Sequence, residues 1–251
     1  MHHNLLKYLA ICCVGVAVSG TSADRAQANF VAFVHLQPDG SDSVVLSDLL
    51  NGEVPGVVVG DKIFSEFFYS TLPNDDMPDP ENVKVFGFED LEGNLGISFH
   101  GVFWDLPDGG PSDALIRYTV EVSPDGLAEG LRISDAHLFL GGVSVGDNSF
   151  LAVDESFQGI NQTLNTFVTT LGGTLNQNLD DEVFFGQLHT KLRVTKDILA
   201  FSGDANMPAV TRVIDQSFSQ VPEPASLVVF AMFGLGLATA RRRPPQRDIG
   251  S

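Results

Sequence analysis

Between apolar stretches at its two ends, the chain places apolar residues at every second position of many short runs. In the segment 116–122 the apolar positions are Ile116, Tyr118, Val120 and Val122. Because successive side chains of a strand point to opposite faces, these four share one face. Turn sequences separate such runs about every ten residues, as Pro-Asp-Gly does at 38–40 and 124–126. The pattern predicts an all-β fold, a single antiparallel β-sandwich of roughly ten strands.

One segment, 160–171, also fits a helical spacing. Its threonine and asparagine residues are poor helix formers, and Gly172-Gly173 follow it directly. We therefore expect a strand or a loop at this position.

The first apolar stretch belongs to a segment, residues 1–28, with the order of a secretory signal. Lys7 is the only charged residue ahead of the apolar run, and Ala26 and Ala28 form the small-x-small site at which signal peptidase cuts. The run is too short for an ordinary spanning helix. Both cysteines of the chain lie in this segment, so we expect a mature domain without disulfides or thiolate metal sites.

The second apolar stretch, 225–240, contains no charged residue and would span about 24 Å as a helix. Three arginines, Arg241, Arg242 and Arg243, follow it at once. By the positive-inside rule they stay in the cytoplasm, so the chain before residue 221 lies outside. The stretch predicts a transmembrane helix, followed by a cytoplasmic tail at 244–251.

Residues 222–243 resemble the tripartite PEP-CTERM protein-sorting signal of exported bacterial proteins. Pro222, Glu223 and Pro224 precede the apolar helix, and the arginine cluster closes it. The resemblance implies that an exosortase, a membrane-embedded cysteine protease, processes the chain near Pro-Glu-Pro. The precursor would then lie in the inner membrane, with the mature form at the cell surface or secreted, in bacteria that usually make exopolysaccharide.

The mature domain between the two signals, 29–221, is strongly acidic. It contains eight basic and 29 acidic residues, a net charge near −21. Such a field repels nucleic-acid phosphates and anionic headgroups, so we expect no nucleic-acid partner. With 193 residues it can bury one sizeable core, which favours a single domain.

This domain also resembles a group of PEP-CTERM-bearing proteins of unknown function. The shared segments are GDKIFS at 60–65, GNLGISF at 93–99, DALIRY at 113–118, ISDAHL at 133–138, VTKDI at 194–198 and DQSFSQ at 215–220. The resemblance implies no activity and transfers no catalytic residue.

Histidines and acidic loop residues are the candidate metal ligands of the mature domain. His35, His100, His137 and His189 are far apart in sequence and lack the spacing of a histidine metal motif, so we expect strand histidines and no bound cofactor. Calcium is the alternative, because it takes carboxylates from loops. The acidic clusters suited to it comprise Asp75, Asp76, Asp79 and Glu81, and Asp105, Asp108 and Asp113.

One serine lies in a sequence typical of a catalytic nucleophile. Gly-Val-Ser-Val-Gly at 142–146 matches the nucleophile-elbow pattern around Ser144, with Asp154 and His189 in the order of a triad. That chemistry needs a strand, a sharp turn and a helix, whereas the run after Ser144 reads as a turn and another strand. We expect a glycine-bounded hairpin.

These observations predict a non-enzymatic protein of the cell surface or extracellular matrix. Its expected partners are signal peptidase, an exosortase and, after processing, exopolysaccharide or other surface components. A calcium- or glycan-binding adhesin-like module and a secreted hydrolase using Ser144 are the alternatives.

Overall fold

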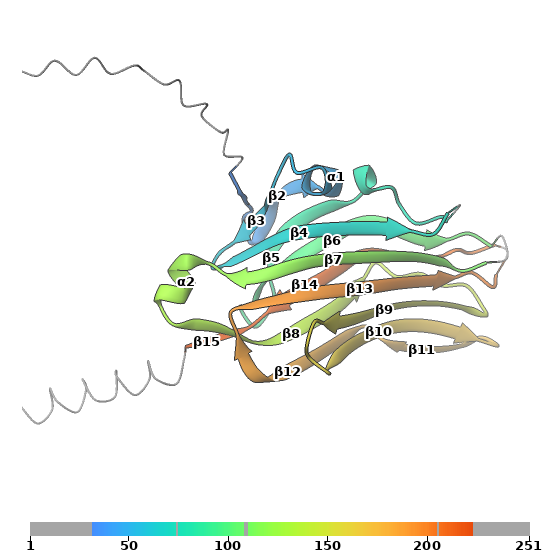
Figure 1. Ribbon diagram of the computed structural model, residues 1–251. Helices are drawn as coiled ribbons and strands as arrows, with labels where there is room; N and C mark the ends of the chain where they lie inside the picture. The colour runs from blue at the N-terminus through green and yellow to red at the C-terminus, as the bar shows by residue number, and fades with distance from the viewer. Residues whose placement is uncertain (1–31, 74, 108–109, 205, 223–251) are drawn as a thin grey trace, which may run out of the picture. The chain divides into compact units, whose positions relative to one another are not determined.

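A computed structural model describes residues 32–73, 75–107, 110–204 and 206–222 of the chain. These residues form two packed β-sheets (Figure 1), and all strand pairs but one are antiparallel. The predicted β-sandwich is therefore confirmed. The described part contains fifteen strands where the pattern indicates about ten, because several strands have only two to five residues. The signal segment and the predicted transmembrane helix lie outside the described residues.

The eight-stranded sheet runs, from edge to edge, through β1 (Val34–His35), β3 (Gly56–Val59), β4 (Lys62–Thr71), β7 (Ser112–Val122), β13 (Lys191–Phe201), β9 (Ser149–Phe157), β10 (Thr163–Leu171) and β11 (Thr174–Asn178). The seven-stranded sheet runs through β12 (Asp180–His189), β8 (Leu131–Gly141), β14 (Ala209–Phe218), β6 (Leu95–Asp105), β5 (Lys84–Glu89) and β2 (Asp39–Val45), with β15 (Gln220–Pro222) also paired to β8. Helices are short: α1 (Leu46–Leu50), α2 (Pro124–Ala128) and the 3-10 turn η1 (Pro80–Asn82). None of these described helices could cross a bilayer.

The predicted strand at 116–122 lies inside β7, at the middle of the eight-stranded sheet. Its four alternating apolar residues are all buried, as the period of two requires. The segment around 160–171 is strand β10 after a turn, which agrees with the expectation of a strand.

An aromatic cluster joins the two sheets at the centre of the core. The ring of Tyr118 lies 6.1 Å from that of Phe64, in the same sheet, and 5.9 Å from that of Phe99, in the opposite sheet. Phe64 in turn lies 6.2 Å from Phe218 on β14. The buried rings supply much of the apolar area that holds the sheets together.

Buried charges also link the sheets. Lys196 on β13 forms an ion pair with Glu155 on β9, and its ammonium group also donates to the Gln216 side chain on β14. Lys62 on β4 pairs with Asp61 and donates to the Gln220 side chain on β15. Lys196 is buried together with its partners, whereas the partners of buried Lys62 are partly exposed. Each buried ammonium group is thus paired, as buried charges require.

Candidate functional site

An open pocket of about 450 Å³ lies on the outer face of the seven-stranded sheet. Strand register brings its residues together. Glu182, His137 and Ser217 form one row across β12, β8 and β14, and Asp180, Phe139 and Asp215 form the next. The residues that line the pocket are Phe88, Glu89, Asp90, Leu91, Glu92, His137, Phe139, Asp180, Glu182, Asp215 and Ser217.

Alternation along β8 explains why this face is polar. Leu138 and Leu140 point into the core and are fully buried. His137 and Phe139 point the other way, and Phe139 keeps 43% of its surface exposed. One strand thus supplies both the core and the floor of the pocket.

The turn between β5 and β6 forms one wall of the pocket. The Asp90 carboxylate accepts hydrogen bonds from the backbone N–H groups of Glu92 (3.0 Å) and Asn94 (2.8 Å). Gly93 takes a positive φ of 88° in this turn, a conformation that glycine adopts without strain. The other Asp90 oxygen accepts from the Ser217 hydroxyl at 2.6 Å, which ties the turn to β14.

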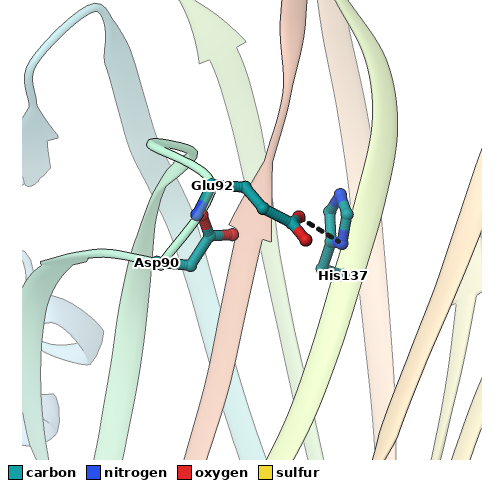
Figure 2. A group of neighbouring side chains, drawn as sticks. All are labelled: Asp90, Glu92 and His137. Atoms are coloured by element: carbon teal, nitrogen blue, oxygen red, sulfur yellow. Dashed lines mark hydrogen bonds and ion pairs between the residues drawn. The ribbon is translucent and has the colours of Figure 1, made fainter.

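His137 lies at the centre of a group with Asp90 and Glu92, whose possible ligand atoms all lie within 4.8 Å of one another. Figure 2 shows the Glu92 side chain reaching from the turn towards the imidazole of His137. The His137 Nδ1 atom lies 3.9 Å from a Glu92 oxygen and 3.7 Å from a Glu182 oxygen. On the other side of the ring, Nε2 lies 3.2 Å from the Asp135 carboxylate and 3.3 Å from the Ser219 hydroxyl.

The surroundings shift the pKa values of His137, Asp135 and Asp215. The hydrogen bond to Asp135 raises the pKa of His137, and this effect outweighs the burial of the ring. Burial opposes ionisation of Asp135, but hydrogen bonds from His137 and Ser219 outweigh it and lower the pKa of that carboxyl. Burial also raises the pKa of Asp215, despite its hydrogen bond from Ser98. The site therefore favours positive charge on whatever it holds.

Six carboxylates, one imidazole and two phenylalanine rings can together bind cations or groups that donate hydrogen bonds. No lysine or arginine is among the described residues that line the pocket. Anionic ligands are disfavoured for that reason.

The loops of the calcium candidates come together, although Asp108 lies outside the described residues. Asp75 accepts from the backbone N–H of Asp113 at 2.6 Å, and Asp76 accepts from that of Leu106 at 2.8 Å. Buried Asp105 accepts from the Ser112 hydroxyl and from the backbone N–H of Ser202. These carboxylates hold loops together through hydrogen bonds. Asp79 is exposed, just ahead of η1. Calcium binding at these residues stays a prediction.

Ser144 lies in an isolated bridge to Val210, ahead of β9. A strand follows it, as the hairpin interpretation expects, and the helix of a nucleophile elbow is missing at this point of the described chain. Ser144 and His189 line two different pockets. Asp154 accepts a hydrogen bond from the side chain of Asn165.

Of the sorting-signal residues, the structure describes Pro222, the last residue of β15. Glu223, Pro224 and the arginines Arg241, Arg242 and Arg243 lie outside the described residues, as do Ala26 and Ala28 at the predicted signal-peptidase site.

The sequence pattern did not predict that four residues would be neighbours in the fold: Asp90, Glu92, His137 and Glu182. A usable signal was present in β8, where Asp135, His137 and Phe139 alternate with buried residues. That alternation places an acid, an imidazole and an exposed ring on one face of one strand.

Comparisons with known proteins identify the C-terminal signal. A family model, the PEP-CTERM protein-sorting motif, matches residues 220–243. The motif therefore begins inside the fold, at the first residue of β15. No curated protein matches the chain.

Among solved structures, the chain is similar to TmCBM61, solved in complex with β-1,4-galactotriose, at 15% identity over 62% of this chain and 90% of that chain, with a TM-score of 0.30. It is also similar to the enzymatically active domain of tailspike protein 4 of bacteriophage CBA120, at 13% identity over 62% and 20% of the two chains, with a TM-score of 0.28. A third structure, the mannan-recognising carbohydrate-binding module TmCBM27, gives 10% identity, 71% and 97% coverage and a TM-score of 0.26.

TM-scores this low carry no argument about function. The sorting motif does carry one, because it marks an exported chain that an exosortase sorts to the cell surface. The chain therefore carries a PEP-CTERM protein-sorting motif at residues 220–243.

Proposed function

We propose that the mature domain is a non-enzymatic binding protein of the cell surface or matrix, and that its outer-face pocket holds saccharide units of exopolysaccharide. The observation that carries the proposal is the pocket itself. It combines the partly exposed rings of Phe88 and Phe139 with six carboxylate groups. After signal peptidase and exosortase have acted, the domain would meet such polymers outside the cell.

Saccharides match this combination of groups. The C–H face of a sugar ring packs on an aromatic ring, and its hydroxyl groups donate to carboxylates such as Asp180 and Glu182. The charge of the pocket favours neutral sugars and protonated amino sugars over uronic acids. Hydrogen bonds to ionised acceptors are stronger than neutral ones, so a few correctly placed hydroxyl groups suffice to orient the ligand.

The test is a binding titration with extracted exopolysaccharide and with soluble oligosaccharides of neutral and amino sugars. Phe139→Ala removes the exposed ring of the pocket, and about a tenfold loss of affinity is expected. Phe150→Ala is the matched control. Phe150 is also partly exposed, but it lies in the eight-stranded sheet, away from the pocket, and its ring stacks on that of Phe201. This variant should bind like the wild type.

Two outcomes would contradict the proposal. If the wild-type protein binds none of these saccharides, saccharides are not its ligands. Equal affinities for Phe139→Ala and Phe150→Ala would show that the pocket is not the saccharide-binding site. Reducing-sugar release during the same incubations checks the absence of catalysis, and we expect none.

A further inference from the structure

The His137 side chain is held as a metal ligand would be held. Its Nε2 atom lies 3.2 Å from the carboxylate of Asp135, which is 5% exposed. Asp135 in turn accepts from the backbone N–H of Ser219 at 3.0 Å and from the Ser134 hydroxyl at 3.1 Å. An ionised carboxylate can only accept, so the hydrogen on Nε2 is donated to Asp135. The ring is thereby oriented with Nδ1 towards the pocket.

Metal-binding histidines are positioned in this way. Their second ring nitrogen donates to a carboxylate or carbonyl, which sets the tautomer and the direction of the ligating lone pair. Asp90 is held on its ligating atoms instead: one oxygen accepts from the backbone N–H groups of Glu92 and Asn94, and the other accepts from the Asn94 side chain and the Ser217 hydroxyl. Metal binding by Asp90 therefore replaces one of these hydrogen bonds. Both supporting serines, Ser217 and Ser219, lie just ahead of the sorting motif, which begins at residue 220.

The distances on the open side of the ring suit a cation between the groups. Nδ1 lies 3.9 Å from Glu92 and 3.7 Å from Glu182. With metal–ligand bonds of about 2.0–2.2 Å, the ligand atoms of a tetrahedral site are about 3.4 Å apart. The Glu92 and Glu182 side chains are 71% and 58% exposed. Both can therefore move the remaining few tenths of an ångström by side-chain rotation.

We propose that His137, Asp90 and Glu92 bind a divalent transition-metal ion of the zinc type, with Glu182 as the fourth ligand. An imidazole nitrogen with carboxylate oxygens suits zinc and its neighbours, whereas calcium takes oxygen ligands alone. The site differs from the calcium candidates in both its residues and its chemistry. It shares a pocket with the proposed saccharide site, but it does not depend on saccharide binding.

The test is isothermal titration with zinc chloride of the metal-stripped full chain, in detergent and without a histidine tag. Cys12 and Cys13 are replaced by serine in every variant, because their thiolates would bind zinc themselves. One strong zinc site per chain is expected. His137→Gln and Glu92→Gln should each weaken that site at least tenfold, and Glu92→Gln lies on an exposed turn where loss of folding is not a concern. His35→Gln and Glu53→Gln, which replace exposed residues outside the pocket, are the matched controls and should titrate like the wild type.

Cobalt provides a second readout, because its visible absorption reports the ligands. A cobalt spectrum that His137→Gln abolishes and His35→Gln preserves would support the site, and calcium in excess should not displace the cobalt. Absence of a strong zinc site, or a zinc site that His137→Gln leaves unchanged, would overturn the inference. Saccharide is absent from these titrations, so their failure leaves the proposed function standing, and the failure of saccharide binding leaves the metal result standing.

Discussion

Two oppositely charged residues in the core, Lys196 and Glu155, show how this domain accommodates buried charge. Lys196 and Glu155 are both fully buried, and the Gln216 side chain accepts a further hydrogen bond from Lys196. Burial lowers the pKa of Lys196 and raises the pKa of Glu155. Each charge therefore depends on the other for its stability.

Removing one partner should be far more harmful than removing both. Glu155→Leu leaves the ammonium group of Lys196 unpaired in the core, and the free energy of unfolding should fall by about 3–5 kcal/mol. The double variant Glu155→Leu/Lys196→Met replaces the pair by apolar groups and should regain most of that loss. Urea unfolding of the three proteins measures both effects. A Glu155→Leu variant as stable as the wild type would contradict the structural role of the pair.

His137 should make stability depend on pH. Its pKa is raised above the usual 6.5 by Asp135 and the neighbouring carboxylates, so the folded state holds the proton more tightly than the unfolded state does. The resulting stabilisation is complete below pH 6.5 and is lost as the pH rises through the raised pKa.

The check is a set of unfolding curves of metal-free protein from pH 6 upwards. The difference in unfolding free energy between wild type and His137→Gln should shrink as the pH rises. A difference that stays constant with pH would show that the imidazole is not charged in the folded state. The comparison cancels other titrating groups, including His189, whose pKa burial lowers.

At the scale of elements, close approach of β6 to β14 sets the geometry below the pocket. A Cβ atom on Gly96 would lie 2.0 Å from the backbone oxygen of Gln216. Gly96→Ala should therefore push the strands apart and lower the free energy of unfolding by about 1–3 kcal/mol. Gly186→Ala on β12 is the control, because open space surrounds that position. Thermal unfolding measures both, and equal melting temperatures would contradict this packing.

The alternation of apolar residues was enough to predict the long central strands. It predicted the buried face of β7 residue by residue, and it favoured a strand over a helix at β10. It did not separate the short strands β1, β11 and β15, since two to five residues are too few to display a period. A bulge interrupts the alternation in strand β12. Its register against β8 shifts between Phe184 and His189, so inward and outward positions do not alternate evenly there.

At the scale of the whole molecule, the pocket depends on contacts that no local pattern contains. Asp90 and Glu92 come from a turn, whereas His137 and Glu182 come from strands that follow 45 and 90 residues later. Only the strand order β12-β8-β14-β6-β5 brings them to one face. The acidic loop residues that sequence favoured for calcium, such as Asp75 and Asp76, lie in other loops and accept backbone hydrogen bonds there. Sequence shows where carboxylates are numerous, and the topology decides which of them converge.

The sorting motif predicts a defined mature product. β15 pairs residues 220–222 with β8, so the first residues of the motif belong to the fold. In a host with an exosortase, the intact mass should correspond to a chain that lacks the signal segment and the residues beyond the Pro-Glu-Pro region. In a host without one, the arginine cluster should be retained. A tail kept through Arg243 in both hosts would contradict processing.

We propose that this exported domain binds its ligand on the outer face of the seven-stranded sheet. Hydrogen–deuterium exchange with and without exopolysaccharide tests it most directly. We expect slower exchange at 88–92, 137–139 and 180–184, with little change around Phe150 and Phe201 in the eight-stranded sheet. Protection confined to the eight-stranded sheet, or no protection at a saturating concentration, would contradict it.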